Sequence, residues 1–459
     1  MRRSRSRFRP WIVPLLLVAA SRGWAAVGDA GPPTDPVLES LIEQSLAALP
    51  ELKAAHDADR SAHERISQAY ALPDPSLQVG VQNDSFTSWE VGKMETSWYS
   101  IMWSQTFPWP GKRKLNSRVM ELGSSQFHQA TQRLVLTTEA DVRRAYLDLL
   151  LARDRLSLLD RLEAISLKSV TLARTRYEAG SGAQSDLLRA QLEVNRIKQR
   201  RWALQVQADN AVQSLNRLRG HPLDEPIATS IHLSELPLPS LQDESQAVQD
   251  ALERSPELAA ARIGVAERES SLELARKNRR PDLTINAGVM PRGGDFSTMW
   301  LVNVGSTLPI FTRSKQDKAV AENEARAAAA GSSAQAIEEV LRLRVRQRAT
   351  AFRAIDDTIR LYLDGLLVQS EATAESTQAQ YEVGRVTFAA VLEANAGFIS
   401  DQDGYLQVLV QAQTLAIDAR EVRLAPASVP GAGPLELGAP SSSSPPGSAA
   451  SGSAPMRSM

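Results

Sequence analysis

The side chains that most often carry catalysis or metal binding are few and scattered in this sequence. The chain contains no cysteine, which excludes disulfides, thiolate metal sites and a lipidated cysteine. His56 and His63 lie two turns apart on one predicted helix, a spacing more typical of solvated side chains than of a ligand pair. Gly111-Lys112 lacks the upstream glycine and the following serine or threonine of a phosphate-binding loop. The sequence therefore predicts no enzyme, no metal site and no cofactor.

A tyrosine–glutamate–x–glycine motif occurs twice instead, each time between two long helical patterns. Glycine at its last position would supply the left-handed residue that ends a helix. The tyrosines would either staple the turn by packing or take part in a polar contact, and the glutamates are also compatible with ordinary solvated turn residues. The residues of interest at the two turns are Tyr177, Glu178, Gly180, Tyr381, Glu382, Gly384 and Arg385.

The sequence contains two tandem copies of one unit, because four segments recur in one order at a nearly constant offset of roughly 200 residues. We assign 27–239 to the first copy of the unit and 240–424 to the second. The matching segments are LIEQSLAALPELKAA from Leu41 with AVQDALERSPELAAA from Ala247, PDPSLQVGV from Pro73 with PDLTINAGV from Pro281, TFPWP from Thr106 with TLPIF from Thr307, and YEAGSGAQSDLLRA from Tyr177 with YEVGRVTFAAVLEA from Tyr381.

Each copy contains two predicted β-strands, over about 75–83 and 96–107 in the first and about 282–290 and 297–308 in the second. Apolar and polar residues alternate along them, which is the pattern of a strand with one apolar face. Taken alone, these strands fit a membrane β-barrel and a soluble hairpin on a core equally well. Their tryptophans are Trp98, Trp103 and Trp300.

Long heptad patterns follow each strand pair, over about 112–220 and about 314–424. Heptads of this extent predict antiparallel coiled-coil hairpins about 100 Å long. Asp186, near the start of the first return helix, would be a favoured N-cap residue. In the second copy the pattern of the outgoing long helix runs through Leu341, Val345, Phe352, Ile355, Ile359, Tyr362 and Leu366.

A rigid corner, FPWPG at 107–111, joins the second strand to the first long helix. Pro108 and Pro110 donate no ladder hydrogen bond, so the sheet must stop there. Trp109, like the strand tryptophans, suits a membrane–water interface, and the basic run 112–114 suits lipid headgroups or solvent. A proline turn in a soluble protein is the alternative.

The two ends of the chain differ in composition from the repeats. Residues 1–26 combine a basic start, a short apolar stretch and small residues, which predicts a signal peptide. Residues 425–459 are mostly proline, glycine, serine and alanine and are predicted to be disordered. Between them no stretch reaches the length of a transmembrane helix. The near-zero net charge gives no indication of a nucleic-acid partner.

Four strands cannot close a barrel, and lipid tolerates no open strand edges. If the strands lie in a membrane, several chains must therefore share one barrel. A trimer, with twelve strands, leaves a lumen that suits the polar strand face, whereas eight strands would be filled by their own side chains. The predicted fold is mainly α with a small β part: two tandem units of helix, β-hairpin and long antiparallel coiled-coil hairpin.

The chain resembles the TolC family of outer-membrane efflux channels over about 38–424. The resemblance rests on this doubled plan, on LPDP at 72–75, on FPWPGK at 107–112, and on RYEAG…SDLL and QYEVG…AVL at the turns. It implies a homotrimer whose twelve-strand barrel lies in the outer membrane and whose helical barrel crosses the periplasm. It also implies a periplasmic adaptor protein at the helix tips and an inner-membrane pump. The FPWPGK corner is closer to members that serve heavy-metal resistance–nodulation–division pumps.

The same resemblance implies a gate at the helix tips, closed by a tyrosine–aspartate link. The matching positions are Tyr381 and Asp186, and an acidic ring matches Glu393. The family's gate arginine aligns with Val386, next to Arg385, so the locking network differs here. The adaptor would contact the two tyrosine–glutamate–x–glycine turns.

Two other functions stay open at this point. One is a type I protein-secretion duct of the same architecture, and the other is a soluble periplasmic coiled-coil adaptor or scaffold. The strand aromatics and the doubled hairpin speak against the scaffold. The sequence does not name the exported substrate.

Overall fold

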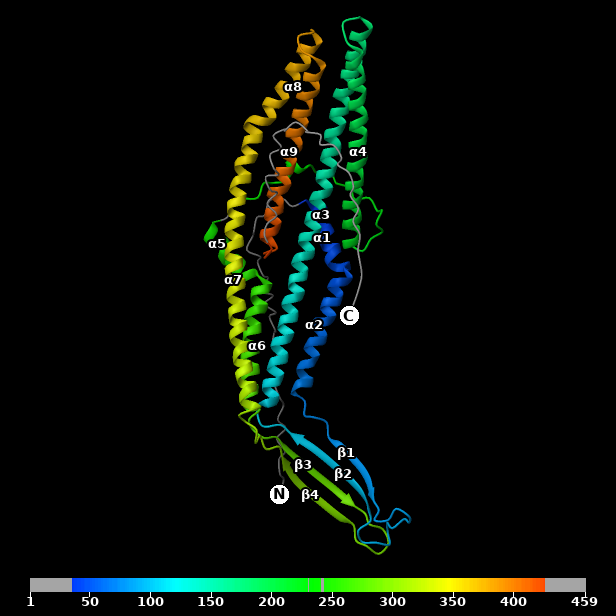
Figure 1. The fold of residues 1–459 in the computed structure, drawn as a ribbon, viewed down its shortest axis with the longest axis vertical. Coiled ribbons are helices and arrows are strands. Elements are labelled where there is room, and N and C mark those ends of the chain that lie inside the picture. Colours follow the sequence, from blue (N-terminus) through cyan, green and yellow to red (C-terminus); the bar gives the residue numbers. More distant parts are fainter. Residues whose placement is uncertain (1–34, 230, 241–242, 426–459) are drawn as a thin grey trace, which may run out of the picture.

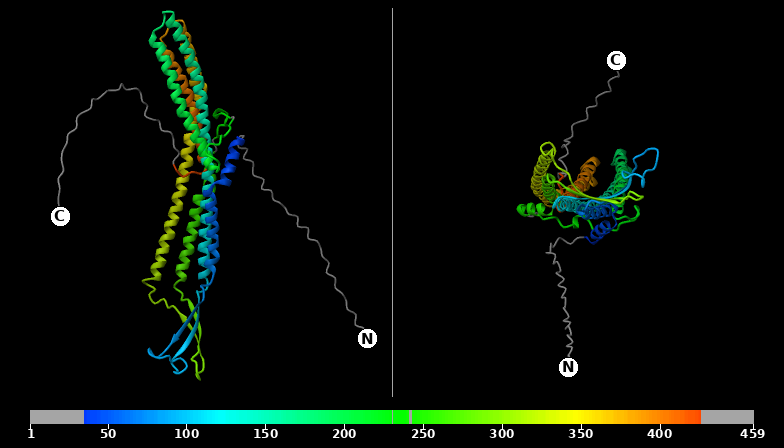
Figure 2. Two further views of the ribbon diagram at one scale, coloured as in Figure 1. Left: turned by 90° about the vertical axis from the view of Figure 1, so that its right-hand side faces the viewer. Right: turned by 90° about the horizontal axis from the view of Figure 1, so that it is seen from below.

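The computed structural model describes residues 35–229, 231–240 and 243–425. The predicted signal peptide, and the predicted tail from residue 426 on, lie outside this part. The molecule is elongated, with a sheet at one end and two helical hairpins at the other (Figures 1 and 2). Its elements are α1 (Pro36–Ala48), α2 (Pro50–Tyr70), β1 (Ser76–Gln82), β2 (Trp98–Phe107), α3 (Lys112–Glu178), α4 (Gln184–Leu218), the 3₁₀ turn η1 (Leu233–Glu235), α5 (Glu244–Arg254), α6 (Pro256–Lys277), β3 (Leu283–Met290), β4 (Met299–Ser306), α7 (Gln316–Leu361), the π-helical segment η2 (Tyr362–Leu366), α8 (Leu367–Glu382) and α9 (Phe388–Arg420).

The two copies of the unit fold alike. Proline begins α2 and α6, where its missing N–H costs no helical hydrogen bond. Side chains cap α1 and α6, because Asp35 accepts from the Val37 N–H at 3.0 Å and Ser255 accepts from the Leu258 N–H at 3.2 Å. The strands of the two copies join in one antiparallel sheet of order β1-β2-β3-β4, so β1 and β4 are its free edges.

Helix α3 is the spine of the molecule. Its 67 residues make it about 100 Å long. It packs against α2 and α6 near the sheet, against α1 at mid-length, and against α4 and α9 toward the tips. Figure 1 shows α4 at one side of this helical layer and α7 and α8 at the other. None of the helices in the described part of the chain combines the length and apolarity that crossing a membrane requires.

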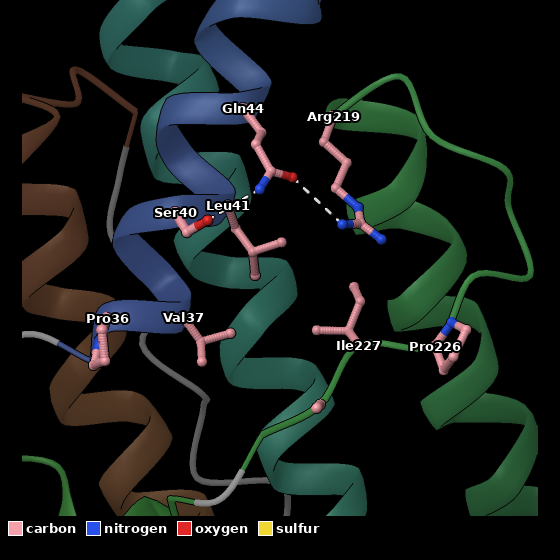
Figure 3. Close-up of a pocket in the computed structure, with 9 residues that line it drawn as sticks. Pro36, Val37, Ser40, Leu41, Gln44, Arg219, Pro226 and Ile227 are labelled. Carbon is pink, nitrogen blue, oxygen red and sulfur yellow. Dashed lines mark hydrogen bonds between the residues drawn. The ribbon is translucent and has the colours of Figure 1, made fainter.

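Helix α1 lies at mid-length beside the end of α4. Figure 3 shows Arg219 donating to Gln44 at 3.4 Å, and Gln44 donating in turn to Ser40 at 3.0 Å. These residues line a cavity of about 340 Å³ that also takes in Leu41 and Ile227. The cavity is a gap between α1 and the segment that follows α4, and its lining residues do not form a catalytic arrangement.

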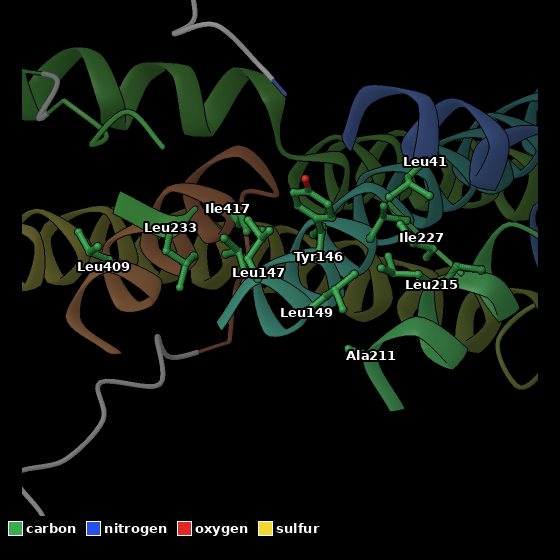
Figure 4. Close-up of a cluster of buried hydrophobic side chains, with 14 of the residues drawn as sticks. Leu41, Tyr146, Leu147, Leu149, Ala211, Leu215, Ile227, Leu233, Leu409 and Ile417 are labelled. Atoms are coloured by element: carbon green, nitrogen blue, oxygen red, sulfur yellow. The ribbon is translucent and has the colours of Figure 1, made fainter. Parts of the chain in front are cut away.

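The largest hydrophobic core also lies at mid-length and is drawn in Figure 4. It joins α1, α3, α4 and α9, so it holds both copies together. Tyr146 of α3 is its largest fully buried side chain. Beside this core, Arg144 binds the buried Asp418 at 2.8 Å and the buried Glu421, which fixes the end of α9 on α3. Removing one partner of such a pair costs several kcal/mol, because a charge is left buried alone.

The long outgoing helix of the second copy is present but is not regular along its whole length. A π-helical segment, η2, separates α7 from α8, and the ribbon bends there (Figure 1). The ring of Tyr362 lies close to Tyr405 of α9, and its hydroxyl lies close to Gly404. A π segment adds a residue to one turn, which a heptad pattern does not reveal.

Substitution of Gly404 tests this contact. A Cβ at Gly404 would lie 2.4 Å from the Tyr362 hydroxyl, whereas one at Gly397 of the same helix meets nothing within 4 Å. Alanine in a helix is otherwise favoured over glycine by about 1 kcal/mol. We expect Gly397→Ala to raise the melting temperature of the detergent-solubilised protein and Gly404→Ala to lower it. Equal shifts in both variants would show that Tyr362 does not constrain α9.

Candidate functional site

The sheet has one apolar and one polar face. The pairing register places Leu77 opposite Trp103 and Trp103 opposite Ala287, so every second residue of all four strands shares a face. The opposite face carries mostly small and polar groups, and its Asn286 side chain donates to Asn303 at 2.7 Å. Its apolar residues are Trp98, Met102, Met290, Met299 and Leu301. Exposed apolar side chains on the first face are Leu77, Val79, Val81, Tyr99, Ile101, Trp103, Phe107, Leu283, Val289, Trp300, Val302 and Val304. Such a sheet can separate lipid from water.

The tryptophans do not all lie where an interface belt would place them. Trp103 and Trp300 are on the apolar face, but Trp103 is in the middle of β2. Trp98 falls on the polar face by the same alternation and is only partly exposed. Trp109 follows the sheet at the helical end. The interface role of these four residues therefore stays a prediction, and the alternation fits it best for Trp300.

The FPWPG corner is held by the other copy of the unit. The Trp109 N–H donates to Asp282 Oδ1 at 2.7 Å, and Lys112 Nζ binds the same oxygen at 2.9 Å. Lys112 also donates to the carbonyl of Arg280, whose guanidinium lies 5.9 Å from the centre of the Trp109 ring. Gly111 adopts a φ of 91°, which lets the chain turn into α3. Lys112 thus serves the corner itself, rather than only the solvent or headgroups.

The opposite end of the molecule consists of the two helical tips. Gly180 and Gly384 have φ values of 70° and 76°, and each donates its N–H to the tyrosine three residues before it. These are the left-handed residues that the sequence predicts for the helix ends. The proposal that Asp186 caps α4 is wrong, since Ala183 is the N-cap residue and Asp186 lies in the first turn.

The two equivalent tyrosines have different surroundings. Tyr177 is 45 % exposed, whereas Tyr381 is 3 % exposed. Tyr381 packs against Phe388, with 5.4 Å between ring centres, in a cluster that includes Ala190 and Val391. Packing therefore explains much of the role of Tyr381 and little of that of Tyr177.

Arg176 joins the two tips, and the sequence reasoning missed it. Its guanidinium lies 4.7 Å from the centre of the Tyr381 ring and donates to the Tyr381 carbonyl. It also donates to the carbonyl of Ser181 at 3.4 Å. The signal was present in RYEAG, because the second copy has Gln380 at the equivalent position.

The hydroxyl of Tyr381 is buried without a hydrogen-bond partner among the described residues. Burial raises the pKa of Tyr381 above its usual value, and the nearby Asp186 carboxylate raises it further, while Arg176 lowers it. Asp186 is thus close enough to act electrostatically, but the structure of the single chain shows no hydrogen bond between Asp186 and Tyr381. The link that the resemblance implies therefore stays a prediction.

The remaining tip residues are exposed. Within the described part of the chain, no group of three or more histidine, aspartate or glutamate side chains is arranged to hold a metal ion. The exposed residues among those singled out from the sequence are Glu178, Glu382, Arg385 and Glu393.

Comparison with known families decides the assignment. The model of the family described as outer membrane efflux protein matches residues 41–221 and 247–420, one match for each copy of the unit. The chain belongs to this family. It is an outer-membrane efflux channel of the TolC type, with a periplasmic extension, and not an enzyme. Channels of this family are trimers that act with an adaptor and an inner-membrane pump.

Curated relatives are distant but extend over most of the chain. The pyoverdine export outer membrane protein OpmQ of Pseudomonas aeruginosa is 24 % identical over 420 residues, covering 81 % of this chain and 82 % of OpmQ. The cobalt-zinc-cadmium resistance protein CzcC of Cupriavidus metallidurans is 24 % identical over 384 residues, covering 83 % and 88 %.

Solved structures share the fold. The outer-membrane channel OprN superposes with a TM-score of 0.69 at 20 % identity, covering 84 % of this chain and 90 % of OprN. CusC superposes with a TM-score of 0.72 at 17 % identity, covering 86 % and 93 %.

Replacing Arg176 should loosen the tips. Arg176→Met removes a stacked cation and two hydrogen bonds, and the stacking alone is worth about 1 kcal/mol or more. We expect amide hydrogen exchange of Gly384 and Arg385 to become roughly tenfold faster, since 1.4 kcal/mol corresponds to a factor of ten. Arg174→Met, two residues away and exposed, is the matched control. Equal exchange in the two variants would contradict the role of Arg176.

Proposed function

We propose that three copies of this chain form the exit duct of a tripartite pump of the resistance–nodulation–division type, with heavy-metal cations as the exported substrates. The apolar sheet face is the observation that carries the duct. An isolated four-stranded sheet with exposed apolar residues on one face and two unpaired edges is not a stable structure in either water or lipid. Three such sheets, joined edge to edge, form a closed wall with lipid outside and water inside.

The helical layer supports the same assembly. Exposed apolar side chains follow one face of α4, at Leu188, Leu192, Trp202 and Val206. The opposite side of the layer carries Leu361, Leu363 and Val368. Neighbouring copies would cover both surfaces and continue the wall as a helical tube toward the tips.

The substrate proposal rests on chemistry and on relatives. Three of the curated relatives are named for resistance to cobalt, nickel, zinc or cadmium. A duct needs no tight metal site, because conduction requires weak binding. Pyoverdine export is the second candidate, because two relatives are named for it.

We propose that a gate lies at the tips. Tyr381 and Asp186 would be its closing pair, and the Glu393 residues of the three copies would form an acidic ring. The unpartnered hydroxyl of Tyr381 and the neighbouring Asp186 carboxylate support this pairing. The exposed turn residues Tyr177, Glu178, Gly180, Glu382, Gly384 and Arg385 are the proposed adaptor contacts.

Conductance tests the duct and the gate together. The purified protein in a planar bilayer should conduct as a trimer, and Tyr381→Phe combined with Asp186→Ala should raise closed-state conductance severalfold. Tyr177→Phe, at the equivalent exposed position, should leave it unchanged. An unaltered closed state in the double variant would remove the gate proposal, and a protein that forms no channel would remove the duct.

Complementation tests the substrate. The chain should restore cobalt, zinc and cadmium resistance to a strain that keeps a metal pump and adaptor but lacks its outer-membrane component. Restored pyoverdine export without metal resistance would favour the second candidate. Glu393→Gln serves as a companion variant, because loss of the acidic ring should reduce export of metal cations.

A further inference from the structure

The junction between the two copies of the unit within one chain has a defined geometry. Strand β2 pairs with β3, with Trp103 opposite Ala287. Just beyond the sheet, Asp282 accepts from the Trp109 N–H and binds Lys112 Nζ at 2.9 Å. The corner after β2 is therefore clamped by the linker before β3.

The free edges of the sheet carry the two halves of a second junction. The repeated segments TFPWPGK and TLPIFTR make Ile310 the counterpart of Trp109 and Arg313 the counterpart of Lys112. PDPSLQV and PDLTINA make Asp74 the counterpart of Asp282. Ile310 and Arg313 follow β4, whereas Asp74 precedes β1. A cation and an aspartate equivalent to Lys112 and Asp282 therefore lie at opposite edges of the sheet.

These counterparts have no partner in the part of the chain that the structure describes. The side chains of Asp74 and Arg313 are exposed and make no hydrogen bond or ion pair with any other described residue. Leu308 and Ile310 are 69 % and 74 % exposed, whereas their counterparts Phe107 and Trp109 are both 37 % exposed. The difference is the cover that the other copy of the unit supplies at the first junction.

The register of the first junction transfers to the second without conflict. By the same matches, Trp103 opposite Ala287 becomes Val304 opposite Val79. Both valines lie on the apolar face, which a shift of one residue would destroy. The hydroxyl contact of Thr106 with Thr284, at 3.2 Å, would become Thr307 with Ser76, so its chemistry is also retained.

We propose that two neighbouring copies of this chain meet in a seam that repeats the β2–β3 junction, with Val304 of β4 opposite Val79 of the next copy and Arg313 bound to Asp74 of the next copy. The seam rests on the proposed trimer and adds its register and its ion pair. Within one chain the seam cannot form, because β1 and β4 are separated by β2 and β3.

The absence of cysteine makes the register directly testable. Val304→Cys with Val79→Cys places two thiols directly opposite, within reach of a disulfide across a strand pair. Oxidation of assembled membranes should give covalent dimers and trimers. Val304→Cys with Gln78→Cys is the matched control, because those side chains point to opposite faces and should give monomers.

Charge exchange tests the ion pair. Arg313→Glu and Asp74→Arg should each reduce the trimer fraction in detergent, and the double variant should restore it. No restoration would overturn the ion pair. Trimers that conduct but link through 78 rather than 79, or through neither, would overturn the register and leave the proposed function standing. A protein that neither conducts nor forms trimers would remove the proposed function itself.

Discussion

The unpaired backbone of two sheet edges is the constraint on which the rest of this molecule depends. Each edge strand presents N–H and C=O groups that a bilayer cannot satisfy, at several kcal/mol for each group. A side-chain change cannot remove this cost, because the groups belong to the backbone. The chain therefore has a stable sheet only as part of a larger closed structure, and the tandem repeat provides matching ends for such closure.

The duplication explains how one sheet can direct two long hairpins. At the inner junction, Asp282 joins the corner after β2 to the linker before β3, so α3 leaves the sheet in a fixed direction. From there α3 carries both copies, through the core around Tyr146 and the ion pair of Arg144 with Asp418. The position of the tips is thus set by contacts at the sheet and at mid-length, far from the tips themselves.

The sequence predicts the repeating features of this fold well and the local exceptions poorly. Alternation along β1 to β4 and the glycines at Gly180 and Gly384 have strong local signals, because strand period and positive φ depend on few residues. The π segment at Tyr362 and the aromatic stacking of Arg176 depend on a neighbouring helix, which no local pattern reports. Trp98 is a different case, because its odd spacing from Trp103 on the same strand already places the two tryptophans on opposite faces.

The two helical hairpins differ in the local features that the sequence does not predict, and this difference suggests different roles for them. The first hairpin has an uninterrupted helix α3 and an exposed Tyr177, and its Arg176 reaches across to the second hairpin. The second has the π segment, the bend between α7 and α8, and a buried Tyr381 with an unpartnered hydroxyl. A buried unsatisfied hydroxyl costs about 1–3 kcal/mol, so a movement that gives the Tyr381 hydroxyl a partner would lower the free energy of the tip. Because α8 is joined to α7 through an irregular turn, we expect such a movement to be confined to the second hairpin and to change α3 only at the contact of Arg176 with Tyr381.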